Sequence, residues 1–285
     1  MDEINNENSL AFGPFCDREF LAITDIIGCD QVNEDRLNSF EYKADYKYVI
    51  LCWNPDAPRY NDVVKVIESV CPNAYLVLWD DVDNMNLIKC FKEPNIIFKR
   101  ELHPNSNRGG YGAPIYCLPK TSPVFTHIKR RSYSVSFVMG RTDAIVRQNK
   151  TLREIVYEEL LAIKKDDWCI LFDPGMPYEK YIDTLQRSKI SINMYGGGAD
   201  CIRFWEIMSC GACMISPPQK IIYDNPISED CYAPLVVGSL GNTIQGLLEN
   251  DRWKKIAMKG HKEFIANHTI EKRASFIKAK IKETI

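Results

Sequence analysis

The 285-residue sequence lacks any apolar run long enough to cross a membrane. Its longest runs, such as YVILCW at residues 48–53, fall far short of the roughly 20 residues that a membrane-spanning helix needs. The first ten residues, MDEINNENSL, are polar and acidic, without the basic and apolar regions of a secretory signal. We therefore expect a cytoplasmic protein without stable membrane insertion.

The sequence also lacks a strong excess of charge and any clear metal motif. Its 36 basic and 38 acidic side chains give a net charge of -2, which argues against a general attraction to nucleic acid or anionic membranes. The eleven cysteines are odd in number and lie singly in apolar runs, as reduced and packed thiols do. Cys210 and Cys213 form a C-x-x-C pair, but no second pair completes a zinc site. We expect no metal and no cofactor.

What is present is a regular alternation of strands and helices. In the first half, apolar runs at 46–53, 74–79 and 95–99 predict buried strands, and a helix is predicted between the first two. In the second half the same rhythm returns from residue 134 onward. Such alternation is typical of parallel β-α-β units.

A stretch rich in proline and glycine separates the two halves. Residues 104–125 show hardly any hydrophobic periodicity, as expected of a connection between domains. We therefore predict two α/β, Rossmann-like domains. The first covers residues 1–125, including this linker, and the second covers 126–285.

The stretch SINMYGGGADCIRFWEIMSCGACMI, residues 191–215, carries the clearest chemical signal. Three glycines allow the backbone to approach a ligand closely, and the amino terminus of the following helix favours phosphate. Asp200, Arg203 and Glu206 lie on that helix. Alternatively, Asp200 is only a helix cap, Glu206 is solvated, and Arg203 pairs with one of them. The flanking apolar residues narrow any solvated face, which favours a functional site.

Here the sequence resembles GT-B glycosyltransferases, most closely the exostosin-like and spore-maturation-type members. The resemblance rests on Ser188-Lys189-Ile190, on the D-x-x-R-x-x-E helix and on its ending at Cys210-Gly211. Two further segments are similar, FVMGRTDAIVRQNKTLRE from residue 137 and NHTIEKRA at 267–274, although Asn149 replaces an arginine of the family pattern. Together they cover most of residues 131–280. The resemblance implies that the two domains face a cleft, with the acceptor bound by the first domain and the nucleotide sugar by the second.

The resemblance implies roles for single residues. Glu206 would accept hydrogen bonds from the ribose hydroxyls of the donor, and Arg203 would support the diphosphate or brace Glu206. Arg141, with Arg147 or Lys150 as alternatives, would offset the diphosphate charge without a metal. The predicted donor-binding set is Arg141, Gly197, Gly198, Asp200, Arg203 and Glu206. Gly198 stands where related proteins with an E-x7-E motif carry a carboxylate, so the sugar stays open.

Catalysis is predicted to involve the acidic loop after the strand at 74–79. Asp80 and Asp81 follow that strand directly, and ligands of open parallel sheets bind beyond the carboxyl ends of the strands. One of these carboxylates would deprotonate an acceptor hydroxyl. A solvated turn is the alternative for this loop, and Asp56 is the next candidate for the base.

The predicted function is transfer of a hexose or pentose from a nucleotide sugar to an acceptor hydroxyl. The acceptor stays open among a glycan, a protein side chain and a modified nucleic-acid base. A non-catalytic nucleotide-binding module with the same fold is the alternative. A Rossmann-type oxidoreductase is disfavoured, because no G-x-G-x-x-G follows an early strand.

Overall fold

Contacts between residues divide the computed structural model into two compact units. Unit 1 comprises Met1–Pro119, Ile221–Asp224 and Ile270–Ile285, and unit 2 comprises Lys120–Lys220 and Asn225–Thr269. The structure describes residues 4–5, 7–13, 18–33, 36–43, 46–53, 60–81, 87, 90–103, 111–125, 129–140, 146–147, 150–172, 175–196, 198–222 and 224–285. Within these residues, no helix combines the length and the apolar character needed to cross a bilayer.

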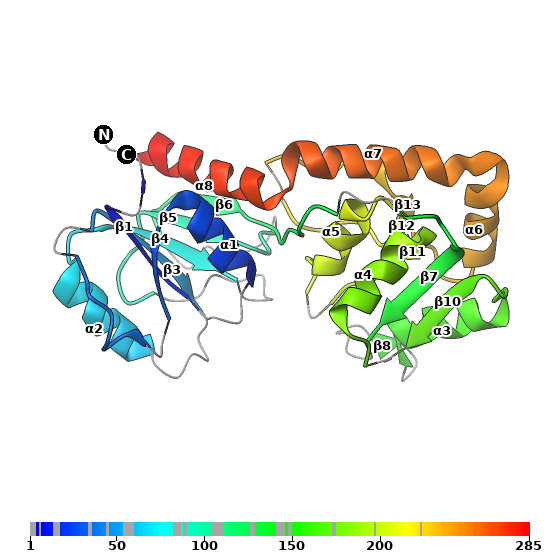
Figure 1. Ribbon diagram of the computed structural model, residues 1–285, viewed down its shortest axis with the longest axis horizontal. Helices are drawn as coiled ribbons and strands as arrows, with labels where there is room; N and C mark the ends of the chain where they lie inside the picture. The colour runs from blue at the N-terminus through cyan, green and yellow to red at the C-terminus, as the bar shows by residue number, and fades with distance from the viewer. Residues whose placement is uncertain are drawn as a thin grey trace. The chain divides into compact units, whose positions relative to one another are not determined.

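Unit 1 contains a six-stranded parallel sheet with the strand order β2-β1-β3-β4-β5-β6 (Figure 1). The strands are β1 (Ser9–Phe12), β2 (Asp30–Val32), β3 (Tyr48–Trp53), β4 (Tyr75–Asp80), β5 (Ile96–Lys99) and β6 (Ile115–Cys117). The helices are α1 (Arg18–Ile27), α2 (Tyr60–Val70) and α8 (Ile270–Thr284). Apolar side chains cover both faces of this sheet, as expected of parallel strands.

The two faces of the sheet in unit 1 bury alternate residues of each strand. On β4, Val77 and Trp79 pack in one cluster with side chains of α1 and α8. Leu76 and Leu78 pack in another cluster, which includes side chains of α2. The period of two along a strand explains this separation.

Unit 2 contains a five-stranded parallel sheet with the order β10-β7-β11-β12-β13, and a separate antiparallel pair, β8-β9. Its strands are β7 (Tyr133–Met139), β8 (Val146–Arg147), β9 (Lys150–Thr151), β10 (Trp168–Phe172), β11 (Ser188–Ile192), β12 (Cys213–Ser216) and β13 (Ala233–Pro234). Its helices are α3 (Leu152–Ala162), α4 (Tyr178–Gln186), α5 (Ile202–Ser209), α6 (Leu240–Leu248) and α7 (Arg252–Asn267), with short 3-10 turns η2 (Glu229–Cys231) and η3 (Glu249–Asp251). One core cluster joins α3, α6 and α7 to the strands.

The predicted fold class, two α/β units with parallel sheets, is confirmed by these sheets. Helix α3 begins with a capping box, in which Thr151 accepts from the Glu154 amide and Glu154 accepts from the Thr151 amide. The sequence-based division assigned all of 126–285 to one domain, whereas α8 belongs to unit 1. The physical reason is that the apolar side of α8, with Ile277 and Ile281, packs in a cluster with α1 and the sheet of unit 1.

Gly260 allows α7 to approach a neighbouring backbone. A Cβ atom at this position would lie 2.8 Å from the carbonyl oxygen of Cys231. In an open helix, glycine to alanine stabilises by about 1 kcal/mol. Here we expect Gly260→Ala to lower the free energy of unfolding by about 1–3 kcal/mol, because the backbone must shift. Urea denaturation measures this change.

Gly246 in α6 is the matched control, since a Cβ there would meet nothing within 4 Å. Gly246→Ala should be neutral or stabilising by up to about 1 kcal/mol. If both substitutions stabilise the protein, the close approach at Gly260 does not constrain the fold.

Candidate functional site

The site predicted from the sequence lies in unit 2, around α5. The strands β7, β11 and β12 are neighbours in a parallel sheet, so their carboxyl ends share one edge. Ligands of such sheets bind at that edge. Helix α5 connects β11 to β12. It ends where Gly211 takes a φ of 62° and donates its amide to the carbonyl of Met208, as predicted for the glycine that follows a helix.

Glu206 of α5 is buried, with only 3% of its surface exposed. The hydroxyl of Tyr181 in α4 donates to Glu206 Oε2 at 2.8 Å, and the Tyr178 hydroxyl is near enough to favour the charged form of this carboxylate. Burial raises the pKa of Glu206 above its usual range, while both tyrosines and the charge of Arg203 act against that rise. The alternative of a solvated Glu206 is therefore wrong, since a carboxylate buried in this way needs polar partners.

Arg203 lies one turn before Glu206 on the same helix. Burial by itself would lower the pKa of Arg203, but the nearby Tyr181, Cys201 and Glu206 together raise it. Its Nη1 lies 3.7 Å from Cys201 Sγ, and its Nε is buried without a hydrogen-bond partner among the described residues. The charge of Arg203 thus acts on Glu206, and the guanidinium keeps donor capacity for a ligand.

Asp200 braces α5 inside unit 2. Its Oδ1 accepts from the indole of Trp205 at 3.0 Å, and its Oδ2 accepts from the amide of Lys120. The expectation that Asp200 caps the helix is wrong, because Cys201 is the N-cap and α5 begins at Ile202. Both carboxylate oxygens already accept protein donors, and the predicted contact of Asp200 with a donor substrate stays a prediction.

Arg153 holds two of the loops that leave this sheet edge. The guanidinium is buried and donates to the carbonyl of Gly140 at 2.9 Å and to that of Tyr195 at 2.6 Å. The Tyr195 hydroxyl in turn donates to the Pro218 carbonyl at 2.5 Å. The loops after β7, β11 and β12 are therefore linked. No separate role was predicted for Arg153 from the sequence, although Arg153 lies near the end of the family-like segment at residues 137–154.

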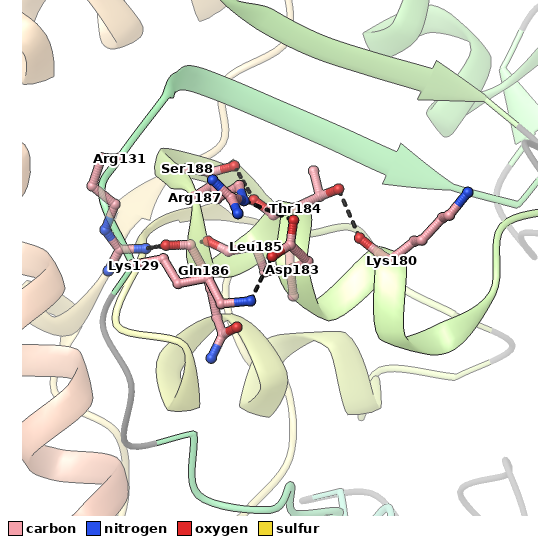
Figure 2. A network of polar contacts seen from close by, with 9 residues as sticks. All are labelled: Lys129, Arg131, Lys180, Asp183, Thr184, Leu185, Gln186, Arg187 and Ser188. Atoms are coloured by element: carbon pink, nitrogen blue, oxygen red, sulfur yellow. Dashed lines mark hydrogen bonds and ion pairs between the residues drawn. The ribbon is translucent and has the colours of Figure 1, made fainter.

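Arg131 holds the carboxyl ends of α4 and α5 together, and Figure 2 shows its side chain at the end of α4. Its Nη1 donates to the carbonyls of Leu185 and Gln186, and its Nη2 donates to those of Cys210 and Gly211. Both helices carry side chains of the site, Tyr181 on α4 and Glu206 on α5. Arg131 therefore fixes the helices that hold the site, and no motif in the sequence pointed to it.

Other predicted donor-binding residues are only partly described. Arg141 and Gly197 lie outside the described residues, as does Asp56, the second choice for a base. Gly198 is described, and its carbonyl accepts from the Gly196 amide at 3.1 Å. Their predicted contacts with a donor stay predictions.

The two predicted catalytic residues lie at the carboxyl end of β4 in unit 1. Asp80 is completely buried and forms an ion pair of 2.9 Å with Lys99, which is also completely buried. These two residues are register partners on β4 and β5. The Asp81 side chain is 19% exposed and lies 3.5 Å from Arg100 Nη1. The environment of Asp80 is that of a core ion pair, whereas Asp81 reaches the surface.

The C-x-x-C pair consists of packed thiols. Cys210 and Cys213 are both buried, and burial raises the pKa of Cys213 to about 12. A thiol with such a pKa does not form the thiolate that binds metal near neutral pH. Over the part of the chain that the structure describes, no group of three or more His, Cys, Asp or Glu residues is arranged to hold a metal ion.

Comparisons with known proteins relate this chain to glycosyltransferases. Residues 146–279 match a family described as glycosyl transferase-like. A glycosyltransferase from Rickettsia africae ESF-5 has a similar structure, with a TM-score of 0.61, 10% identity, and coverage of 97% of this chain and 98% of that chain. An alpha-glucosyltransferase in complex with UDP and a 13-mer DNA containing an A:G mismatch gives a TM-score of 0.58, 10% identity, and coverage of 97% and 99%.

Sucrose-phosphate synthase from Thermosynechococcus elongatus is similar as well, with a TM-score of 0.51, 10% identity, and coverage of 84% of this chain and 73% of that chain. A sequence search of curated proteins gives no match. At such identities the structures show the fold, which is that of GT-B glycosyltransferases. The family match over β11 and α5 supports glycosyl transfer in general.

Proposed function

We propose that the protein is a glycosyltransferase that moves a sugar from a nucleotide-sugar donor to an acceptor hydroxyl. The observation that carries this proposal is Glu206, a buried carboxylate on the helix after β11 that accepts a hydrogen bond from the Tyr181 hydroxyl of α4. The helix lies inside the segment that matches the glycosyl transferase-like family. If Glu206 had only a structural role, an apolar residue would give equal or greater stability at this position. Binding of a polar ligand is therefore the simplest reason for a carboxylate here.

In this proposal the donor binds at the shared edge of β7, β11 and β12. Glu206 accepts hydrogen bonds from the ribose hydroxyls, and Arg203 with the amino terminus of α5 faces the diphosphate. Arg141, Gly197 and Gly198 would complete the phosphate contacts. Because these groups supply positive charge, we propose that no divalent metal takes part. Binding assays are therefore run with chelator present.

We assign the base to Asp81 rather than Asp80. Asp80 is enclosed and paired with Lys99, while Asp81 keeps part of its side chain in solvent. A general base must come within hydrogen-bond reach of the acceptor proton. A glycan, a protein side chain and a modified base remain the proposed acceptor classes. One structural neighbour is an alpha-glucosyltransferase in complex with UDP and DNA. A nucleic-acid acceptor is therefore included in the first assays.

The alternative is a non-catalytic module that binds the nucleotide sugar without transferring the sugar. It shares the donor site with the enzyme but does not need Asp81. Mass spectrometry of products formed from a labelled nucleotide sugar separates the two functions. Binding without transfer to any of the three acceptor classes would support the module.

The test of the donor site is Glu206→Gln. Glutamine keeps the size of the side chain and an acceptor for Tyr181, but it loses the charge. Hydrogen bonds to a charged group contribute about 1.5–3 kcal/mol. We therefore expect nucleotide affinity to fall about tenfold or more, measured by calorimetry after a thermal-shift screen over UDP-, GDP-, ADP-, CMP- and dTDP-sugars.

Glu283→Gln is the control, because Glu283 is exposed on α8 of unit 1 and pairs only with Lys280 in the described contacts. This variant should bind the donor like the unmodified protein. Equal affinity of the Glu206→Gln variant and the unmodified protein would assign Glu206 a purely structural role.

A further inference from the structure

Two tyrosines of α4 hold Glu206 from different environments. Tyr178 is the first residue of the helix and is 42% exposed. Tyr181 lies one turn further along, and its hydroxyl points into unit 2 toward α5, 2.8 Å from Glu206 Oε2. The two rings lie 6.1 Å apart. The Glu206 carboxylate thus has one hydrogen-bond partner inside the fold, Tyr181, and the hydroxyl of the exposed Tyr178 lies near it.

The inner contact fixes the carboxylate. A glutamate side chain loses considerable rotamer freedom when it is held in one geometry, and a bond from a rigid ring on a neighbouring helix removes that freedom before a ligand arrives. Burial raises the pKa of Tyr181 well above its usual value, with the charge of Glu206 as the next cause. Tyr181 therefore stays protonated and donates. With Oε2 oriented in this way, acceptor capacity of the carboxylate remains for other donors.

The outer contact is replaceable. Tyr178 sits at the end of a helix, where the backbone is least restrained, and its side chain is exposed. A ribose diol carries two adjacent hydroxyl donors and would meet Glu206 from the exposed side. When these hydroxyls bind, they take the place that the Tyr178 hydroxyl occupies near the carboxylate without ligand.

We propose that Tyr181 is a positioning residue that holds Glu206 for the two ribose hydroxyls of the donor, whereas Tyr178 occupies the ribose position until the donor binds. This inference rests on the proposed role of Glu206 in the donor site. It assigns the discrimination between ribonucleotides and 2′-deoxyribonucleotides to one hydroxyl on α4. It also predicts that removing the Tyr181 hydroxyl weakens the preference for ribonucleotides, whereas removing the Tyr178 hydroxyl does not.

The pH dependence of binding gives a second readout. The groups that face Glu206 are Tyr178 and Tyr181 from α4, together with Arg203 and Cys210 from α5. The Tyr181 hydrogen bond acts to lower the pKa of Glu206, so its loss raises that pKa. Ribose binding needs the ionised carboxylate. The loss of nucleotide affinity at low pH should therefore begin at a higher pH in Tyr181→Phe than in the unmodified protein. A loss of packing alone would not change the pH at which affinity falls.

The experiment measures affinities for UDP, GDP and ADP and for their 2′-deoxy forms by calorimetry. We expect the unmodified protein to prefer one ribonucleotide over its deoxy form by about tenfold, the worth of one hydrogen bond to a charged group. Tyr181→Phe should reduce this preference to about threefold or less. Tyr178→Phe should keep the preference and bind equally or more tightly. Thermal unfolding of each variant reports whether it is folded.

The outcomes separate the inference from the function on which it rests. If the unmodified protein binds none of the nucleotides, the proposed donor site fails. If it prefers a ribonucleotide and Tyr181→Phe keeps both that preference and the pH profile, only the role of Tyr181 is overturned. Equal loss of preference in the two variants would overturn the distinction between the tyrosines. Should Tyr181→Phe be unfolded, Tyr181→Trp and Glu206→Gln are measured instead, and retained discrimination in either contradicts the inference.

Discussion

Replacing Arg131 with methionine should lower the stability of unit 2 by about 3–5 kcal/mol. Its guanidinium donates to Leu185 and Gln186 at the end of α4, at 3.2 and 2.6 Å, and to Cys210 at the end of α5 at 3.1 Å. The last carbonyls of a helix have no partners within the helix, and a cation there also meets the negative end of the helix dipole. Each charged hydrogen bond contributes about 1.5–3 kcal/mol, and the sum is not additive because the bonds share one group.

Arg187 provides the matched control for this prediction (Figure 2). It lies in the same network but forms an exposed ion pair with Asp183, with 42% and 38% of the side chains exposed. Arg187→Met should cost less than about 1 kcal/mol. Lysine at position 131 should restore only part of the loss, because one ammonium cannot match the fork of a guanidinium. Urea denaturation and calorimetry measure the free energy of unfolding of all three variants. Equal losses of stability in Arg131→Met and Arg187→Met would contradict the proposed role of Arg131 in holding the two helices.

The strands were predictable because parallel strands buried on both faces read as continuous apolar runs. Tyr48–Trp53 and Tyr75–Asp80 are such runs, and both lie within two residues of their predicted bounds. The place of α8 was not predictable in the same way. Its amphipathic pattern shows that one side is buried, but the pattern carries no information on which sheet covers that side. Only the contacts with α1 and the sheet of unit 1 decide it.

The candidate site also contains residues that were predictable from the sequence and residues that were not. Glu206 and Arg203 were predicted because they share one helix and a local motif. Tyr181, Arg131 and Arg153 were not, because their partners lie 13 to 80 residues away in the chain. For the two arginines these partners are backbone carbonyls, which exist at every position and leave no trace in sequence. The core pair of Asp80 and Lys99 likewise depends on the register of β4 and β5.

Separate replacement of Asp80 and Asp81 by asparagine should therefore give two different defects. Asp80→Asn removes the partner of a completely buried Lys99, and breaking such a pair costs about 3–5 kcal/mol. Asp81→Asn affects a partly exposed pair with a distance of 3.5 Å and should cost less than about 1 kcal/mol. If Asp81 is the general base, its loss should slow transfer by roughly a hundredfold, with donor affinity unchanged.

The double variant Asp80→Leu with Lys99→Met distinguishes a structural pair from a catalytic carboxylate. Apolar replacement of both members of a buried pair is often neutral in stability, so this variant should regain most of the loss seen in Asp80→Asn. It should also transfer sugar at a rate close to that of the unmodified protein, because neither group would touch a substrate. Transfer that disappears in the folded double variant, and persists in Asp81→Asn, would move the base from Asp81 to Asp80. Since Asp80 is completely buried, that result would require β4 to expose its last residue when the acceptor binds.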